Sequence, residues 1–385
     1  MSELTPLLQD LVRLPSVNPR GGPGDGGETA VAGYVRDWLQ RHGVQAELHE
    51  VLPGRCNVVA VVPGRREEAV LLESHLDTVE VDGMTVPPYD GVVRGGRLYG
   101  RGACDAKGPL AAFMLAAAEL ALGETPLHTV VLAGVCDEEH DYRGVVHLLE
   151  RLRDRRFVGA VVGEPTGLVL AVAHKGVVRY TVRTTGRAGH SSRPEEAVNA
   201  ISLMAPVLAH LTATPPAIAP HPLLGPATRS VTRIRGGTGP NVIPGTCEAD
   251  VDRRTLPGEE PDAVWEQDRA ELAALGAELD PPFIVDFALD TPADSAVVSA
   301  LCTALAADGR PTDIAGMPFA TDASKIARAG VPTVVFGPGS ILDAHSADES
   351  VDLAEVEAAA RIVVAAVRGM DVTDVPETPQ EPPCG

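Results

Sequence analysis

Several side chains that can bind a metal ion stand directly after apolar segments of the sequence, or in the loops that follow them. These residues are His75, Asp77, Asp105, Glu138, Glu139, Glu164 and His345. Imidazole and carboxylate groups suit zinc, and they also suit cobalt or manganese. Two such ions that share one carboxylate can hold a carbonyl oxygen and an attacking water together. The residue types therefore favour hydrolysis at a centre with two metal ions.

A centre of this kind also needs a base that is not a ligand. The adjacent pair Glu138–Glu139 can supply it, because neighbouring side chains beyond a strand end can point in different directions, so that one binds metal and the other moves protons. Each motif has a simpler interpretation when it is taken alone. A His-x-Asp motif is usually a surface hydrogen bond, a Glu-Glu pair is usually a solvated helix start, and Glu164 before a proline could form a turn. Only their common placement, at or just after the ends of apolar segments, favours a metal site.

The elements that position these residues alternate between helix and strand in the first part of the chain. We expect helices at about 28–42, 109–122 and 143–153, and strands at 56–63, 69–74, 129–135 and 158–163. Continuous Val and Leu runs between helices predict an α/β fold with a mostly parallel sheet and helices on both faces. The carboxyl ends of such strands form one crevice, so the candidate residues are expected to converge there.

The middle of the chain has a different order of elements. Strands are expected at 177–184, 228–235, 245–253 and 283–289, and helices at 195–211 and 261–276. This β-α-β-β-α-β order predicts a ferredoxin-like α+β unit inserted into the first domain. The chain then returns to the first pattern, with helices at 294–308 and 353–368 and a strand at 331–337. We therefore expect a catalytic, metal-binding domain from 1–174 and 289–370, an inserted domain at 175–288, and a disordered acidic, Pro-rich tail at 371–385.

Composition excludes several classes of partner. A formal charge of −21 over 385 residues argues against nucleic acid or an anionic membrane surface. The sequence has no apolar run of about 18 residues, so no membrane span is expected. The N-terminal segment contains acidic residues and has leucines at helical spacing, unlike a signal peptide. The six cysteines are scattered without a CxxC pair, which favours reduced thiols and a cytoplasmic protein.

Six segments with metal-competent or polar residues occur in order along the chain: SHLDTV (74–79), GRGACDAKG (100–108), CDEE (136–139), GEPT (163–166), GHSSRP (189–194) and AHSADES (344–350). Together they resemble the M20 metallopeptidase family, which includes acetylornithine deacetylase, succinyl-diaminopimelate desuccinylase and related carboxypeptidases and aminoacylases. The resemblance covers nearly the whole chain except the tail. One departure is Ser74, which stands where relatives often have glycine, and it changes no ligand.

The resemblance implies a role for each residue of the centre. His75 and Glu164 would bind one metal ion, and Glu139 and His345 would bind the second. Asp105 would bridge both ions. Asp77 would orient the His75 imidazole. Glu138 would be the general base and later the acid that protonates the leaving amine. Cys104 and Cys136 flank this set, and we expect neither to be a ligand, because neighbours of a ligand usually point away from it.

The inserted unit would act as a lid and dimerisation domain, so the resemblance implies a homodimer. His190 alone would be an ordinary loop histidine, but the matching family residue stabilises the oxyanion, often from the partner subunit. Asn241 and Arg254 match positions that hold the substrate carboxylate, where an Arg fork suits bidentate binding. The Asp-x-Arg spacing from Asp252 favours Arg254 over its neighbour. Thr321 and Asp322 are expected near the pocket.

The resulting functional hypothesis is hydrolysis of the amide bond of an N-acyl-L-amino acid, with two divalent ions, zinc or alternatively cobalt or manganese. The segment GRAGHSSRPEEAVNAISLM is more similar to acetylornithine deacetylases than to desuccinylases. Desuccinylation, or cleavage of a short peptide by a dipeptidase or carboxypeptidase, remains an alternative with the same centre. An inactive binding protein is a further alternative. Loss of the base or of the bridging ligand would indicate it, and both are present.

Overall fold

The computed structural model describes residues 3–20 and 27–371. These residues form two compact units: the second unit comprises Ala173–Asp290 and Gly316–Ala320, and the first unit contains the remaining described residues. The predicted disordered tail lies, apart from Asp371, outside the described residues. Among the helices of the described ranges, none is both long and apolar enough to cross a membrane.

The first unit is organised around one large sheet. Its main strands run in the order β1 (Gln45–Leu52), β2 (Arg55–Val62), β6 (His128–Val135), β3 (Arg66–His75), β7 (Phe157–Val162), β18 (Thr333–Val335) and β8 (Leu170–His174). The central strands β6, β3, β7 and β18 are parallel, whereas β1, β2 and β8 pair antiparallel to their neighbours. The short strands β16 (Leu289–Asp290) and β17 (Ile314–Met317) also pair with β8. The mostly parallel sheet predicted from the sequence is confirmed at its centre.

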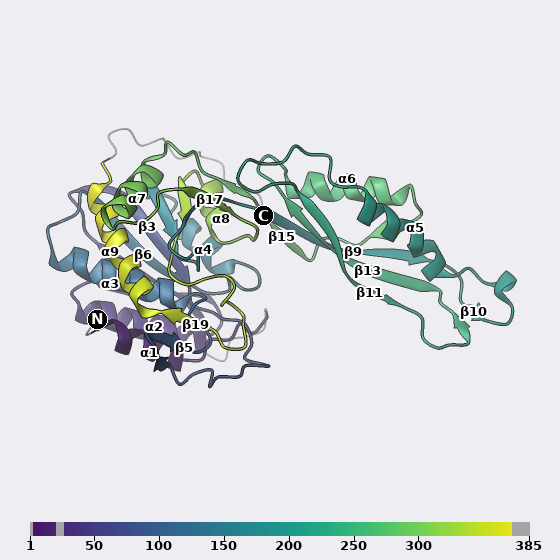
Figure 1. Cartoon of the computed structure of the whole chain (residues 1–385), viewed down its shortest axis with the longest axis horizontal. Helices are drawn as coiled ribbons and strands as arrows, with labels where there is room; N and C mark the ends of the chain where they lie inside the picture. The colour runs from purple at the N-terminus through teal and green to yellow at the C-terminus, as the bar shows by residue number, and fades with distance from the viewer. Residues whose placement is uncertain (1–2, 21–26, 372–385) are drawn as a thin grey trace. The chain divides into compact units, whose positions relative to one another are not determined.

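Helices cover both faces of this sheet. One face packs on α1 (Leu4–Arg13), α2 (Gly27–Arg41), α3 (Lys107–Leu122), α7 (Ala296–Ala307) and α9 (Leu353–Gly369), which share one apolar core with Val70, Leu72, Val130 and Leu132. Side chains alternate between faces along a strand, so the buried Leu71 and Val131 point the other way. On that side α4 (Arg143–Arg151) lies on β6, and α8 (Ala323–Arg328) lies on β7 and contacts α4. Figure 1 shows α3 and α9 side by side.

A small three-stranded sheet supports the loops of the first unit. Its strand order is β19 (Ser350–Asp352), β5 (Arg97–Tyr99) and β4 (Val92–Arg94). Because β19 pairs with β5, the chain that follows His345 is held beside the chain that leads to Asp105. Two loops from distant parts of the sequence are thereby joined.

The second unit has the predicted ferredoxin-like topology. Its elements are β9 (Gly176–Thr185), α5 (Ala200–Ala213), β11 (Thr228–Gly236), β13 (Thr246–Thr255), α6 (Pro261–Ala273) and β14 (Glu278–Leu279). The antiparallel sheet has the order β11-β13-β9-β14, and β15 (Ile284–Asp286) also pairs with β9. Helices α5 and α6 lie along one face (Figure 1), where Val178, Tyr180 and Val182 pack against Met204 and Leu272.

One helix of this unit begins later than the sequence predicts. The expected helix at 195–211 is divided into the short 3₁₀ turn η1 (Pro194–Glu196) and α5, which starts at Ala200. The side chain of Asn199 accepts hydrogen bonds from the amides of Ile201 and Ser202. This N-cap fixes the start of the helix. The preceding residues lead away from the short paired strands β10 (Gly189–His190) and β12 (Val242–Ile243).

Candidate metal centre

The carboxyl ends of the central parallel strands place the candidate ligands together. His75 is the last residue of β3 and lies opposite Val135, the last residue of β6, so the segment that carries Glu139 starts beside it. Glu164 follows β7, and His345 lies in the loop after β18. The ligand atoms of His75, Asp105 and Glu139 all lie within 4.8 Å of one another. The convergence expected from the parallel sheet is therefore present in the geometry.

Asp105 occupies the centre of the group, because each of its carboxylate oxygens faces a different histidine. Oδ1 is 2.9 Å from Nε2 of His75, and Oδ2 is 3.2 Å from Nε2 of His345. Each histidine also faces one glutamate: Glu164 Oε1 is 4.0 Å from the first imidazole, and Glu139 Oε1 is 3.0 Å from the second. Asp105 thus lies between the two histidines, where a carboxylate could be shared by two metal ions.

Asp77 contacts both the first histidine and the glutamate pair. The backbone oxygen of Asp77 lies 2.9 Å from Nδ1 of His75, while its carboxylate Oδ1 is 3.6 Å away. An Nδ1–H that donates to this carbonyl leaves the Nε2 lone pair for a metal ion. The carboxylate of Asp77 accepts hydrogen bonds from the amides of Glu138, at 3.1 Å, and Glu139, at 3.0 Å. Asp77 thus holds His75 mainly through its backbone, and the glutamates through its side chain.

The electrostatics of the cluster suit a divalent cation. Burial raises the pKa of Glu164 well above its usual range, and the charge of Asp105 raises it further. Burial opposes the charge of His75, but hydrogen bonds with Asp105 and Asp77 outweigh this effect and raise its pKa. Hydrogen bonds with Asp105 and Glu139 raise the pKa of His345 to about 10. Carboxylates concentrated in a buried space favour the protonated form of both imidazoles, and a metal ion can replace those protons.

The imidazoles and carboxylates of this cluster are the groups that would hold the ions. Neutral imidazole and carboxylate oxygen are ordinary ligands of zinc, and a carboxylate shared between two ions is the bridging arrangement. The residues present therefore fit two cations, one at the His75 and Glu164 half and one at the His345 and Glu139 half, with Asp105 common to both.

Glu349 supports the backbone at Asp105 and was not singled out by the sequence. Its buried carboxylate accepts hydrogen bonds from the amides of Cys104, at 3.0 Å, and Asp105, at 3.1 Å. Arg101 pairs with the other carboxylate oxygen at 2.5 Å. Glu349 stands in the AHSADES segment that carries His345, which was the available signal. Its position ties that loop to the backbone of Asp105.

A second buried network lies behind the glutamate pair and was also missed. Asp137 has φ of 70°, a left-handed conformation that is uncommon outside glycine. Its carboxylate accepts from Arg143 at 2.6 Å and pairs with Arg55 at 2.7 Å, and its amide donates to Glu28 at 3.1 Å. Arg55 and Glu28 form a fully buried ion pair. This network holds the turn from which Glu138 and Glu139 project.

Burial favours the thiol form of the two cysteines beside the cluster. Burial raises the pKa of both Cys104 and Cys136, and nearby carboxylates raise it further. The Sγ of Cys104 lies 3.3 Å from the carbonyl oxygen of Ser340, to which it donates. A metal ion binds the thiolate form, which the burial of both residues disfavours.

Asp322 lies near the cluster, as the resemblance implied. It stands at the N-cap of α8 and is buried. Burial raises the pKa of the neighbouring Glu73 well above its usual range, and the charge of Asp322 is the next largest cause. Asp322 also raises the pKa of Glu138 and Glu164. Thr321 accepts a hydrogen bond from the amide of Ala323 at 3.2 Å, which shapes the start of the helix.

The second unit holds the three remaining candidates, but it does not bring them together. His190 is exposed, with Nδ1 2.7 Å from the hydroxyl of Ser192, and the Asn241 carbonyl accepts from the Ser191 amide at 3.0 Å. Arg254 instead makes two hydrogen bonds with Asp252, at 2.7 and 3.2 Å.

Arg254 stands near the opposite end of the sheet from this pair of residues. The strand β13 runs from Thr246, near Asn241, to Thr255, next to Arg254. At 3.3 Å per residue this separates Asn241 from Arg254 by about 25 Å or more. Figure 1 shows β10 and β15 at the two ends of this unit.

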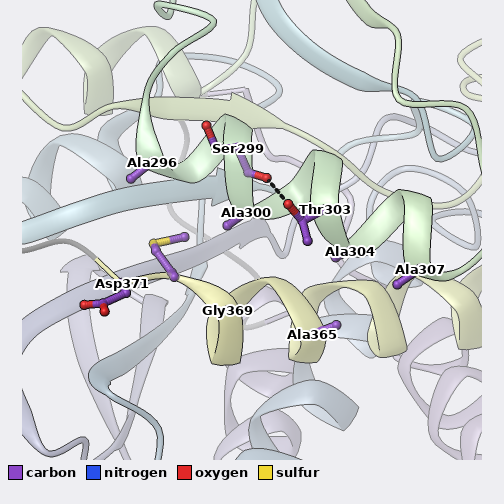
Figure 2. Close-up of a pocket in the computed structure, with 10 residues that line it drawn as sticks. Ala296, Ser299, Ala300, Thr303, Ala304, Ala307, Ala365, Gly369 and Asp371 are labelled. Carbon is purple, nitrogen blue, oxygen red and sulfur yellow. Dashed lines mark hydrogen bonds between the residues drawn. The ribbon is translucent and has the colours of Figure 1, made fainter.

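A groove between α7 and α9 is separate from this chemistry. Its volume is about 260 Å³, and it is lined mainly by alanines, together with Ser299, Thr303, Gly369, Met370 and Asp371. Figure 2 shows the Thr303 hydroxyl donating to the Ser299 carbonyl within its wall, at 2.9 Å. None of the candidate ligands lines the groove.

The fold and the site together define a class of protein, and sequence comparison agrees with it. The profile of peptidase family M20/M25/M40 matches residues 71–369, so the chain belongs to this family of hydrolases. The chain is 30% identical over 373 residues to the acetylornithine deacetylase of Proteus mirabilis, covering 91% of this chain and 92% of that protein.

Solved structures share the fold over almost the whole chain. An M20 family metallo-carboxypeptidase from Sulfolobus solfataricus superposes with a TM-score of 0.80 at 18% identity, covering 96% of this chain and 99% of that one. A dinuclear metal-binding peptidase of the M20 family from Bacillus subtilis gives a TM-score of 0.70 at 19% identity, covering 95% and 97%. The α/β fold class with a second, ferredoxin-like domain is thereby confirmed.

Proposed function

We propose that this protein is a cytoplasmic dizinc hydrolase that removes the acyl group from a small N-acyl-L-amino acid. The observation that carries the proposal is Asp105, whose two oxygens each face one histidine of a buried cluster. The similarity to an acetylornithine deacetylase over nine-tenths of the chain supports an acetyl group and an amino acid with a free carboxylate. The free thiols of the described cysteines Cys56, Cys104, Cys136, Cys247 and Cys302 suit a reducing compartment.

In this proposal Glu138 moves the proton. Its backbone is held by Asp77, and among the described residues its carboxylate makes no ion pair, unlike that of Glu139. Two bound cations would polarise the scissile carbonyl and acidify the attacking water. Burial raises the pKa of Glu138, so the carboxyl binds a proton more strongly than an exposed glutamate. Such a group can take the proton from water and then deliver it to the leaving amine.

The activity is tested with a panel of N-acetyl, N-succinyl and peptide substrates, using protein stripped with a chelator and then reloaded with zinc, cobalt or manganese. We expect no turnover by the stripped protein, recovery on reloading, and the highest kcat/KM on an N-acetyl amino acid. Preference for a dipeptide would favour the peptidase alternative, towards which the carboxypeptidase fold similarity points. Absence of turnover with every metal and every substrate would contradict the proposal.

We also propose a homodimer, in which His190 and Asn241 of one copy serve substrate bound by the other. The separation of about 25 Å or more along β13 supports this, because one copy of the second unit cannot place Asn241 and Arg254 on the same small molecule. His190 lies with Asn241 and would stabilise the oxyanion.

Subunit complementation tests this arrangement. Glu138→Gln and His190→Ala proteins are each expected to be nearly inactive. After co-refolding in equal amounts, half of the dimers are hybrids with one intact site, so about a quarter of wild-type activity is expected. Activity that stays at the level of the separate variants, in a mixture shown to contain hybrids, would place His190 in its own subunit's site. A monomeric protein in sedimentation experiments would also contradict the proposal.

A further inference from the structure

The segment Leu14–Asn18, outside the matched range of the family profile, is fastened to the loops of the metal centre. Lys107 Nζ donates to the Leu14 carbonyl at 2.7 Å, from just beyond Asp105. The amide of Thr78 donates to Ser16, and the amide of Asn18 donates to Thr78, both at 2.9 Å. The first contact reaches the Asp105 loop, and the other two reach the loop that carries Asp77. The segment is therefore part of the framework of the centre.

The side chain of Asn18 joins two buried carboxylates. Its Nδ2 donates to Asp77 Oδ2 at 2.7 Å and to Asp137 Oδ1 at 3.0 Å. Both carboxylates are fully buried, and Asn18 is 7% exposed. The Oδ1 of Asn18 accepts from the Arg20 amide at 2.7 Å, which fixes the orientation of the side-chain amide. Both N–H groups of one amide are thus used to keep two negative side chains in place.

These two carboxylates hold the glutamate pair from two sides. Asp77 accepts the amides of Glu138 and Glu139, and Asp137 is the preceding residue in the left-handed turn. We propose that Asn18 is a positioning residue of the metal centre: it separates Asp77 from Asp137 and thereby fixes Glu138 and Glu139. Without the shared donor, the buried carboxylates of Asp77 and Asp137 would repel each other. The loop that carries Glu138 and Glu139 would then turn, and the Glu139 carboxylate would be displaced. The inference rests on the proposed function, but its principal measurement does not require turnover.

The test uses Asn18→Ala, which removes both donors, and Asn18→Asp, which has the same shape and adds a third carboxylate. Gln9→Ala is the matched control, because the Gln9 side chain in α1 donates to the Gly91 carbonyl at 2.8 Å and, among the described residues, makes no hydrogen bond to a residue of the metal centre. Zinc titration of stripped protein by calorimetry and the visible absorption of cobalt-loaded protein are measured for each. Replacement of residues that support ligands typically weakens metal affinity or activity 10- to 100-fold.

We expect both Asn18 variants to bind at least one zinc ion about 10- to 100-fold more weakly and to show an altered cobalt spectrum, with Asn18→Asp the more affected. In the active enzyme kcat should fall by a similar factor, while KM changes by less than about twofold. Gln9→Ala should match the wild type in every measurement.

The inference would be overturned if the folded Asn18→Ala protein bound zinc as tightly as the wild type and had the same cobalt spectrum. A lower melting temperature of this variant would not rescue it. If Asn18→Asp does not fold, Asn18→Ala decides the question alone. A wild-type protein that binds two zinc ions but cleaves no substrate would refute the proposed function, and the metal titrations would still decide the role of Asn18.

Discussion

Glu138→Gln is expected to lower kcat about 10²- to 10⁴-fold, the range that a general acid–base contributes, which corresponds to about 3 to 5 kcal/mol in activation free energy. The amide has nearly the same shape as the carboxyl but cannot take a proton from water. The backbone hydrogen bond from residue 138 to Asp77 is unaffected by the substitution. Zinc content should therefore remain at the wild-type value, because the proposed ligand is the neighbouring Glu139, which faces His345.

The measurement is steady-state kinetics together with metal analysis by mass spectrometry. Asp141→Asn is the matched control: it removes a carboxylate three residues away, one that is partly exposed and pairs with His140 and Arg143. It should change kcat by less than about twofold, since exposed ion pairs contribute little. Full activity of a zinc-loaded Glu138→Gln protein would show that another group moves the proton.

Asp105→Asn is expected to abolish activity through a different route, by loss of metal. The carboxylate faces both histidines, and an amide in its place has one oxygen and one N–H₂ group, so at most one histidine still faces an oxygen. Without the negative charge that raises their pKa, His75 and His345 should also lose protons more easily. Stripped protein reloaded with zinc should retain fewer than two ions per chain, and activity should fall below detection.

The control for this variant is Asp343→Asn, on the loop that carries His345. Asp343 pairs with Arg97 at 2.6 Å, and both side chains are about a third or more exposed. This protein should bind two zinc ions and remain active. Two tightly bound zinc ions in Asp105→Asn would contradict the bridging role of Asp105.

The convergence of the candidate ligands could be predicted because it depends on local rules. Parallel strands predicted from the runs AVLLES, TVVLAGV and VGAVVG end at one edge of a sheet, and the side chains after them must meet there. The leucines near the N-terminus have the spacing of a helix, and Leu4, Leu7, Leu8 and Leu11 are all buried in α1.

The supporting contacts could not be predicted, since they join residues that carry no local pattern. Asn18 lies 59 residues from Asp77 and 119 from Asp137, in a segment without helical or strand periodicity. Arg55 and Glu28 form a buried pair, although charged residues usually stay at the surface. The strand β1 was also missed, because half of QAELHEVL is polar and the strand lies at the sheet edge, where its pairing with β2 defines it.

The N-terminal part of the chain has a consequence for protein engineering. A fragment trimmed to residues 71–369, the range of the family profile, would begin inside β3 and lack α1, α2, β1 and β2. It would remove Leu8, Leu11 and Val35 from the core, and it would strip β6 of its antiparallel neighbour β2. An uncovered hydrophobic strand edge promotes association between chains. Expression as inclusion bodies is the expected behaviour of such a fragment, so screening libraries should carry the entire N-terminal region.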